Sequence, residues 1–325
     1  QIAAETQKWL YDEAPRHTDK PWVLFVSFVT PHFPLTAPPE HFYRYYNDPD
    51  LPMPKAYGKN ERPNHPSLKD SSTSSNYDDY FKSEDDVRRA IAGYFGLCSF
   101  LDEQVGKVLS ALEASGQGGN TRVVYTSDHG DNLGARGLWG KSTMFEEAAG
   151  VSLIMAGEGI PWGKTVDTAA TFLDIYPFII DCVGESEAGM VDDDHPGTSI
   201  LALAEGAEPD RTVLSEYHAM GSSGAIFMLR DRCYKYIHFA AYPPMLFDLD
   251  KDPEELNDLA DDPTYAEIRA DFEARLRARL DPEAVDRRCK ARQGQQIAAN
   301  GGREAVIARG DLGYSPPPGY QPELG

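Results

Sequence analysis

The sequence predicts an α/β protein in which a layered sheet domain precedes a small antiparallel-sheet subdomain. Residues 21–29 (PWVLFVSFV) form a near-continuous apolar run, which is typical of a strand buried on both faces in a parallel sheet. Residues 84–113 repeat apolar side chains at every third or fourth position, which is the period of an amphipathic helix. After about residue 205 the sequence changes to short, partly alternating segments separated by turns, which favours antiparallel strands.

A loop and a long polar stretch connect the first predicted strand to the long helix. The strand is followed by a Pro-rich loop at residues 31–40 (PHFPLTAPPE). Residues 47–82 contain few aliphatic side chains and many Pro, Asn, Ser and Asp, so we expect a long surface excursion. Ser83 and Asp86 have the spacing of a capping box, which predicts that the helix begins at Glu84.

Two more strands and one helix complete the predicted first domain. Residues 121–127 (TRVVYTS) follow a Gly-rich turn and have the apolar, β-branched character of a short buried strand. Residues 151–156 predict a further strand, and residues 168–180 predict a helix. The alternation of helices and strands favours a mainly parallel, layered sheet.

The small subdomain is predicted from strand-like segments and one charged helix. The segments are TVLSEYHA, AIFMLRD, CYKYIHFA and MLFDL, at residues 212–219, 225–231, 233–240 and 245–249. A helix over residues 264–280 is expected to pack on the sheet that they form. We therefore divide the chain into a sheet domain at residues 1–205, a small α+β subdomain at 206–290 and an extended tail at 291–325.

Composition and the tail indicate which partners to expect. The formal net charge of -21 argues against nucleic acid or an anionic membrane, because both reward clusters of Lys and Arg. No apolar run is long enough to cross a bilayer. The Gly- and Pro-rich end of the tail (GYSPPPGYQPELG) could order against a second subunit, so a homo-oligomer is one expectation.

The cysteines and the first residues bear on location. Cys98, Cys182, Cys233 and Cys289 are widely spaced and form no C-x-x-C pair, which favours reduced thiols and a cytoplasmic location. Residues 1–14 (QIAAETQKWLYDEA) have the pattern of a helix that is already under way, and the chain begins with Gln. We therefore expect the native protein to begin upstream, which leaves a periplasmic location open.

Asp128 and His129 are the first candidates for chemistry, because they directly follow the strand predicted at residues 121–127. Ligand sites in open α/β sheets form outside the carboxyl ends of the strands. A carboxylate oxygen and an imidazole nitrogen side by side can bind a divalent metal. The alternative interpretation of an Asp at this position is a turn or helix cap.

Lys141 and His32 are the candidates for contact with an anionic substrate. Lys141 lies in a Gly-flanked apolar loop (GLWGKS), from which a lysine can direct a compact positive charge at an ester oxygen. His32 closes the strand predicted at residues 21–29, where an imidazole could protonate a leaving alcohol. The alternatives are a solvated surface lysine and a histidine bonded to its own loop.

Weaker candidates lie nearby in the sequence or in the small subdomain. Arg136 could bind substrate or pair with an acidic neighbour, and His218 could line the pocket or serve only as scaffold. Glu146 and Glu147 are expected to cap or solvate the helix after Lys141 rather than to act as acids.

Three motifs in order resemble the sulfatase family of the alkaline-phosphatase superfamily. The region from Arg88 to Met155, with the core SDHGDNLGARGLWGKSTMFEE, is the most specific, and it is most similar to choline-sulfatases and phosphonate monoester hydrolases. PWVLFVSFVTPHFPLTAPPE resembles the family's strand and substrate-histidine loop, and MLFDLDKDPEELNDLA resembles its closing signature. The resemblance implies an alkaline-phosphatase-like sheet domain, of which this chain is the downstream part, with a small C-terminal antiparallel-sheet subdomain.

The resemblance also implies roles for individual residues. Asp128 and His129 would be one pair of ligands to a divalent metal, Lys141 would bind the sulfate, and His32 would be the general acid. Calcium is the metal expected from the family, although a His at position 129 also suits manganese or zinc, and magnesium stays open. His218 and Arg136 are candidates for further substrate contacts on their position in the sequence alone, and the resemblance assigns them no role.

Two family features are absent from the sequence. No Cys or Ser begins the C/S-x-P-x-R motif whose first residue matures to formylglycine, and the family's upstream Asp-Asp metal pair is missing. We therefore expect an amino-terminally truncated chain that is inactive alone and a complete protein that hydrolyses small sulfate monoesters. The alternatives are a phosphonate monoester or phosphodiester hydrolase of the same superfamily, and a non-catalytic binding or assembly protein.

Overall fold

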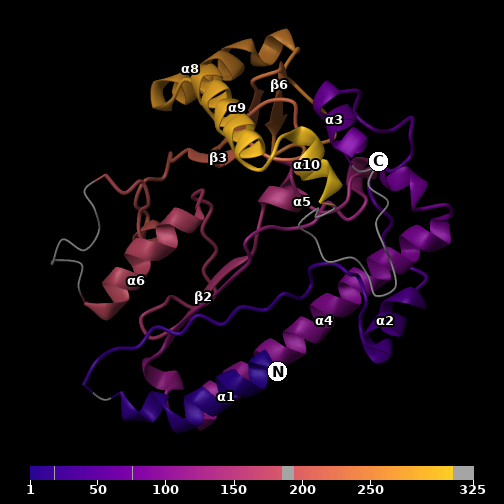
Figure 1. The fold of residues 1–325 in the computed structure, drawn as a ribbon. Helices are drawn as coiled ribbons and strands as arrows, with labels where there is room; N and C mark the ends of the chain where they lie inside the picture. Colours follow the sequence, from indigo (N-terminus) through magenta and orange to yellow (C-terminus); the bar gives the residue numbers. More distant parts are fainter. Residues whose placement is uncertain (18, 75, 185–193, 310–325) are drawn as a thin grey trace.

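The computed structural model describes residues 1–17, 19–74, 76–184 and 194–309, whose helices and strands form two separate sheets with helices around them (Figure 1). The α-helices are α1 (Ile2–Asp12), α2 (Pro39–Tyr46), α3 (Pro66–Ser74), α4 (Glu84–Ala114), α5 (Glu146–Ala149), α6 (Ile175–Val183), α7 (Ile200–Glu205), α8 (Ala266–Arg279), α9 (Pro282–Ala299) and α10 (Arg303–Ala308). The strands are β1 (Arg122–Thr126), β2 (Leu153–Gly157), β3 (Val213–Tyr217), β4 (Ile226–Arg230), β5 (Tyr234–Phe239) and β6 (Tyr242–Asp248).

The long helix α4 supports the loop that carries His32. The predicted capping box is confirmed, since Ser83 Oγ accepts the Asp86 N–H at 3.2 Å and Asp86 Oδ2 accepts the Ser83 N–H at 2.9 Å. Two glycines of α4 let the loop that follows His32 approach the helix closely. A Cβ at Gly93 would lie 2.4 Å from the Leu35 carbonyl oxygen. A Cβ at Gly96 would lie 2.8 Å from the nearest side-chain atom of the loop. The helix therefore fixes the position of the loop after His32, because the loop backbone packs directly on the two glycines.

The first sheet differs from the predicted parallel one. Strands β1 and β2 pair antiparallel, with Thr126 opposite Leu153. The run at residues 21–29 is extended but pairs with no described strand, and its side chains alternate between partly buried and exposed. Phe25 is 89% exposed and Val29 is 75% exposed. The prediction of a strand buried on both faces is therefore wrong for the described residues, because apolar composition cannot show whether a neighbouring strand is present.

The small subdomain has the predicted four-stranded antiparallel sheet, in the order β3-β4-β5-β6. Both faces of this sheet are buried. One face packs on α8 and α9, through residues that include Phe227, Leu246, Phe272 and Leu276. The predicted charged helix at 264–280 is confirmed as α8 with a short 3-10 turn before it.

The opposite face of the small sheet packs on the segment that follows Lys141. Met228, Ile237 and Phe247 from the sheet join Met144 and Phe145 in one buried apolar cluster. Alternate residues of β4 therefore serve two different cores, as the period of a strand requires. The small subdomain therefore supports the segment that follows Lys141, because Met144 and Phe145 pack on its sheet.

The polar excursion also contacts the small subdomain, through His65 and the helix α3. Its helix α3 lies beside that subdomain (Figure 1), and His65 Nε2 is 3.0 Å from the Pro243 carbonyl oxygen. Asp70 accepts the Tyr242 hydroxyl and the Ser223 N–H at 2.9 Å each. The predicted surface excursion thus contains a helix, α3, whose hydrogen bonds attach the excursion to the small subdomain.

The extended tail predicted from residue 291 is wrong for residues 291–308. The helix α9 continues to Ala299, and α10 follows it. Asp281 caps α9 by accepting the Ala284 N–H at 2.9 Å, and Pro282 occupies the first helical position, where a missing N–H costs nothing. The Pro-rich segment GYSPPPGYQPELG lies outside the described residues.

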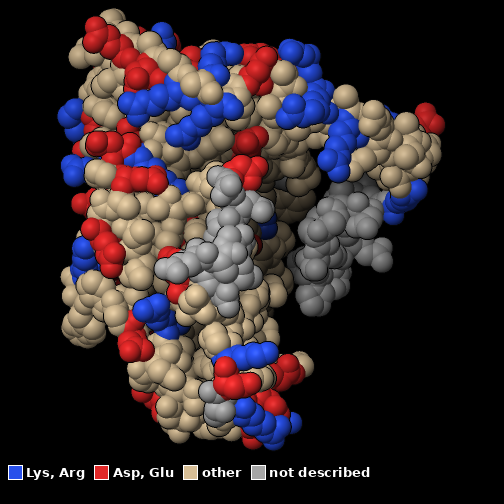
Figure 2. Space-filling view, turned by 90° about the vertical axis from the view of Figure 1, so that its left-hand side faces the viewer, with Lys and Arg blue, Asp and Glu red and all other residues tan. Residues whose placement is uncertain are grey.

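Charged side chains are mixed on the face of the molecule shown in Figure 2. Near the top of that view, where α8 and α9 lie, basic and acidic side chains are interspersed (Figure 2). Within the described part of the chain, no helix has the length and apolar character needed to cross a membrane.

Candidate active site

Four residues that the sequence singled out lie together beyond the end of β1. His32 Nε2 is 2.7 Å from Lys141 Nζ, and the rings of His32 and His129 lie 6.0 Å apart between centroids. His129 Nε2 is 3.6 Å from Asp128 Oδ2. The structure therefore joins the two loops that the sequence separates by about a hundred residues into one polar cluster, which we call the site cluster (His32, Asp128, His129 and Lys141).

The hydrogen bonds of His32 define its tautomer. Its Nδ1 lies 2.9 Å from the Phe33 carbonyl oxygen, which can only accept, so Nδ1 carries the hydrogen. The Nε2 lone pair then accepts a hydrogen bond from the Lys141 ammonium. Lys141 also lies 5.6 Å from the centre of the Phe33 ring, a distance at which the ring attracts a cation. His32 is thus held as a neutral acceptor next to an accessible positive charge.

His129 is held in the tautomer that suits a metal ligand. Its Nδ1 lies 2.8 Å from the Gly130 carbonyl oxygen, so Nδ1 donates and Nε2 keeps its lone pair. That lone pair faces Asp128, whose other oxygen accepts the His129 N–H at 3.0 Å. Two acceptors facing each other fit a cation between them, and the Asp128 side chain is 86% exposed and therefore accessible. Residues 128 and 129 fit a divalent ion as two of its ligands.

The described residues contain no group of three or more His, Cys, Asp or Glu side chains arranged to hold a metal ion. A divalent ion normally takes at least four ligands in proteins, and calcium takes six to eight. The described part of this chain therefore offers a partial coordination set.

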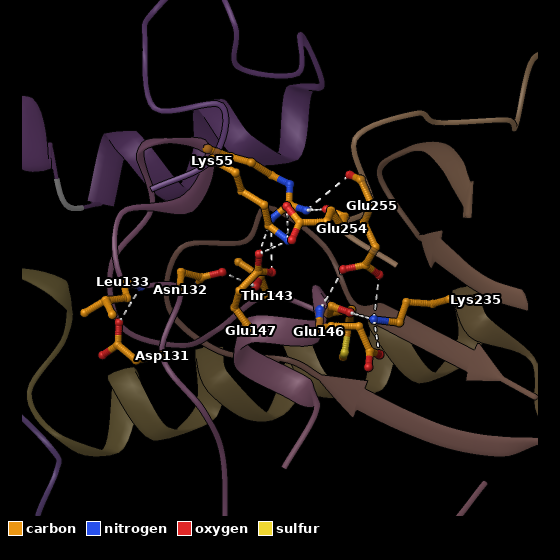
Figure 3. Close-up of polar contacts among 12 residues, drawn as sticks. Lys55, Asp131, Asn132, Leu133, Thr143, Glu146, Glu147, Lys235, Glu254 and Glu255 are labelled. Carbon is orange, nitrogen blue, oxygen red and sulfur yellow. Dashed lines mark hydrogen bonds and ion pairs between the residues drawn. The ribbon is translucent and has the colours of Figure 1, made fainter. Parts of the chain in front are cut away.

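Asp131 and Asn132 fix the loop between His129 and Lys141, and the sequence interpretation did not assign them a role. Asp131 Oδ1 accepts the Leu133 N–H at 2.8 Å (Figure 3). The same oxygen accepts the Gly140 N–H at 2.8 Å. Asn132, which is buried, donates from its backbone and its side chain to the Gly140 carbonyl at 2.7 Å. Both peptide groups of the residue before Lys141 are thus held. The sequence signal for this closure is the pair of Asx residues before a Gly-rich turn.

Gly130 lets the next helix lie directly against His129. Its N–H donates to the Ala148 carbonyl of α5 at 2.9 Å. A Cβ at this position would lie 2.0 Å from the Glu147 carbonyl oxygen, far inside any tolerable contact. The residue after His129 therefore has to be glycine for α5 to occupy its place.

Arg136 is engaged in an ion pair instead of facing the site cluster. Its fully buried guanidinium lies 3.0 Å from a Glu147 carboxylate oxygen and 4.0 Å above the Phe145 ring centre. Its backbone has a φ of 56°, in the left-handed region, and its N–H donates to the Lys55 carbonyl at 2.9 Å. Of the two roles considered for Arg136, pairing with an acidic neighbour is what the structure shows.

Glu146 and Glu147 are half-buried ion-pair partners, so the expectation that they cap or solvate the helix is wrong. Glu146 lies 2.6 Å from Lys235 Nζ, and Glu147 lies 2.7 Å from Lys55 Nζ. Burial disfavours the charged form of Glu146, but Lys235 and Arg230 together outweigh burial and hold the pKa of Glu146 below its ordinary value. The pKa of Glu147 is likewise lowered, because its cationic partners outweigh its burial.

His218 lies in the small subdomain, between the end of β3 and α9. Its Nε2 is 2.9 Å from Glu216 Oε2, and its carbonyl accepts from Gln293 Nε2 at 2.6 Å. Its ring packs edge-on against Phe227. Among the described residues, none of its contacts reaches the site cluster.

Family models match most of the chain. The model described as Sulfatase matches residues 1–185, and the model described as N-sulphoglucosamine sulphohydrolase, C-terminal, matches residues 134–281. The fold is that of the alkaline-phosphatase superfamily. This chain belongs to the sulfatase family of that superfamily.

Individual relatives agree with the family assignment. The chain is 34% identical to a choline-sulfatase from Rhizobium meliloti (strain 1021), over 81% of the chain and 51% of the relative. It is 30% identical to the multifunctional alkaline phosphatase superfamily protein PehA from Trinickia caryophylli, over 78% of the chain and 54% of that protein. The chain thus spans about half the length of these curated relatives.

Solved structures show the same fold. The phosphonate monoester hydrolase SpPMH from Silicibacter pomeroyi superposes with a TM-score of 0.71 and 26% identity, over 88% of this chain and 61% of that one. The structure of BT4656, solved in complex with D-glucosamine-2-N,6-O-disulfate, superposes with a TM-score of 0.70 at 21% identity, over 87% of this chain and 70% of that one.

Proposed function

We propose that the native protein carrying this sequence hydrolyses small sulfate monoesters with the help of a divalent metal. The observation that carries the proposal is the site cluster, in which an exposed lysine and a neutral histidine face an aspartate–histidine pair. Relatives that are named choline-sulfatase and arylsulfatase K support sulfate esters as the substrate class.

Asp128 and His129 would hold the metal, through a carboxylate oxygen and Nε2. Calcium is our first expectation, with manganese, magnesium and zinc as alternatives, because an imidazole ligand suits the softer ions. When bound, the metal supplies positive charge that polarises the ester oxygens. The relatives are about twice as long as the part that this chain matches. We propose that the corresponding further part of the native protein supplies the remaining metal ligands and the formylglycine nucleophile.

Lys141 and His32 would act on the ester itself. The Lys141 ammonium can bind a sulfate oxygen and stabilise the charge that develops as the ester bond breaks. When the ammonium turns toward the sulfate, the His32 Nε2 lone pair is released and can take up a proton from solvent; the resulting imidazolium can give that proton to the leaving alcohol and return to the neutral form. The carbonyl of Phe33 keeps His32 oriented throughout, because it accepts from Nδ1.

Hydrolysis of phosphonate monoesters is a second candidate function. Two solved phosphonate monoester hydrolases, from Silicibacter pomeroyi and Agrobacterium radiobacter, superpose at TM-scores of 0.71 and 0.67 with 26% identity each. The same four side chains would serve either ester, because both present a tetrahedral anionic centre to a lysine and a metal. Substrate turnover has to decide between them.

The test is a substrate panel with the purified native protein. Choline sulfate, 4-nitrophenyl sulfate and a 4-nitrophenyl phosphonate monoester would be compared at equal concentration, with and without chelation of divalent metals. We expect sulfate esters to be turned over fastest. Chelation should abolish the activity, and addition of calcium or manganese should restore it. Faster phosphonate turnover would favour the second candidate, and no turnover of any ester would favour a non-catalytic protein.

A further inference from the structure

A group of charges that includes the fully buried Lys235 and Glu255 joins the Lys141 segment to the small subdomain. We call it the interdomain charge cluster, and Figure 3 shows most of its members meeting around α5. Its members are Lys55, Arg136, Glu146, Glu147, Arg230, Lys235, Glu254 and Glu255. The proposed hydrolysis uses none of them directly.

Lys235 is the central cation of this cluster. It lies on β5 and is fully buried, and its Nζ donates to the Met144 carbonyl at 2.9 Å. The same ammonium lies 2.6 Å from Glu146 Oε1 and 2.6 Å from Glu255 Oε1 (Figure 3). The ammonium thus donates one hydrogen bond to the backbone and forms ion pairs with two carboxylates.

Glu255 links the same group to the start of α5. It is fully buried, its backbone has a φ of 53°, and its Oε2 accepts the Glu146 N–H at 2.7 Å. One carboxylate of the small subdomain and one lysine of its sheet therefore grip both the backbone and the side chain of Glu146. A buried charge set of this kind is costly to assemble, and it defines one geometry when complete.

From α5 the contacts continue to the site cluster. The Ala148 carbonyl accepts the Gly130 N–H at 2.9 Å, and the Gly130 carbonyl accepts from His129 Nδ1 at 2.8 Å. This path runs from Lys235 through one short helix to the ring that the proposed metal would use. The steps before and after α5 are polar contacts, and α5 itself connects them.

A second path leads from Lys235 toward Lys141. Met144, whose carbonyl Lys235 holds, is three residues after Lys141 in the sequence. On the other side, the hydrogen bonds of Asp131 and Asn132 fix Gly140. The segment bearing Lys141 is therefore held at both ends.

We propose that Lys235 is a positioning residue for the hydrolytic reaction, which sets the places of His129 and Lys141 by holding Met144 and Glu146. The expected effect on turnover rests on the proposed function. The placement of the two side chains can be measured without turnover. Lys235 touches no substrate, so its effect passes through the loop that it holds.

The experiment compares three variants of the native protein. Lys235→Met removes the ammonium, and Lys235→Met with Glu255→Gln removes one charge of each sign and so relieves the unpaired buried carboxylate. Arg211→Met is the matched control, because it breaks the buried Arg211–Asp174 ion pair of 2.7 Å, which has no contact with residues 128–148 among the described residues. All kinetic measurements are made at a temperature where each variant is folded by circular dichroism.

We expect Lys235→Met to lower kcat on the order of 100-fold, as a displacement of about 1 Å can do, while Arg211→Met stays within about threefold of the native protein. The double variant should regain thermal stability without regaining kcat. If kcat returns together with stability, the positioning role is overturned. If Lys235→Met does not fold, Glu146→Gln decides, because it keeps the shape of the side chain and should still lower kcat about tenfold.

A second measurement is independent of turnover. Nitrogen-15 spectra of histidine-labelled protein report the tautomer of His129, whose Nδ1–H is bonded to the Gly130 carbonyl. We expect this signal to shift or broaden in the double variant and to be unchanged in Arg211→Met. An unchanged His129 signal in the double variant would overturn the positioning role, whereas an inactive native protein with the expected spectral change would overturn only the proposed function.

Discussion

The site cluster and the interdomain charge cluster both bring acidic and basic side chains together, but the central residues of the two clusters differ in exposure. In the site cluster Asp128 is largely exposed, and the contact between Lys141 and His32 is open to solvent. In the interdomain charge cluster Lys235 and Glu255 are fully buried, and the Lys235 ammonium is paired with two carboxylates and a carbonyl oxygen. The comparison teaches that the charges available to a ligand are the exposed ones, while buried and paired charges fix the backbone around them.

The largest expected difference between the two clusters is in stability. Lys235→Met leaves the buried carboxylate of Glu255 without its partner, and such a loss costs about 3–5 kcal/mol of unfolding free energy. Urea denaturation followed by circular dichroism measures this cost. A loss below about 1 kcal/mol would show that the buried charges do not hold the fold.

Lys141→Ala should give the reverse pattern. We expect kcat for sulfate esters to fall by about 10²–10³-fold, because a donor to the developing charge is removed. The unfolding free energy should change by less than about 0.5 kcal/mol, since exposed side chains contribute little. Steady-state kinetics and denaturation on the same preparation provide the check, with Lys251→Ala as a control at an exposed lysine of the small subdomain. Native-like kcat in Lys141→Ala would remove Lys141 from the mechanism.

Gly130→Ala tests the contact between the two clusters. The added methyl would meet the Glu147 carbonyl at 2.0 Å, so α5 has to move, at a cost of about 1–3 kcal/mol. Gly106→Ala in α4 is the matched control, because nothing lies near its added Cβ and a helical alanine should stabilise by about 0.5–1 kcal/mol. Equal thermal shifts in the two variants would contradict the close approach.

The smallest expected effect is a change in acid sensitivity. The pKa of Glu146 in the native state is lowered below its ordinary 4.5, so the native protein binds fewer protons than the unfolded chain below that pH. Its stabilising contribution is therefore present above pH 4.5 and is lost as the pH falls through the lowered native pKa. Burial raises the pKa of Glu255, which gives the opposite slope above pH 4.5. Glu146→Gln should flatten the loss of stability below pH 4.5, and an unchanged acid slope would contradict the pairing with Lys235.

The sequence predicted those parts of the molecule that depend on local pattern. The helix at 84–114, its capping box and the small antiparallel sheet follow from periodicity and turn residues, and the structure has them. The strand-end position of Asp128 and His129 follows from the apolar run before them. The convergence of these residues with His32 and Lys141 came from the family resemblance, which gave their common site without their geometry.

The sequence could not predict what depends on distant partners. Lys235 is an ordinary lysine in a strand pattern, and only the tertiary structure brings it to Met144 and Glu146. The burial assigned to residues 21–29 failed because an apolar run does not reveal which strands are present beside it. The tail at 291–308 became helical because Asp281 and Pro282 start a helix whose later polar residues carry little pattern of their own.

The most direct test of the account is a crystal structure of the native protein soaked with manganese and inorganic sulfate. We predict an anomalous peak about 2.0–2.3 Å from His129 Nε2 and from a carboxylate oxygen of Asp128, with sulfate bound to Lys141 Nζ and within reach of His32 Nε2. Metal bound elsewhere, or sulfate away from Lys141, would contradict the assignment of the site cluster as the centre of hydrolysis.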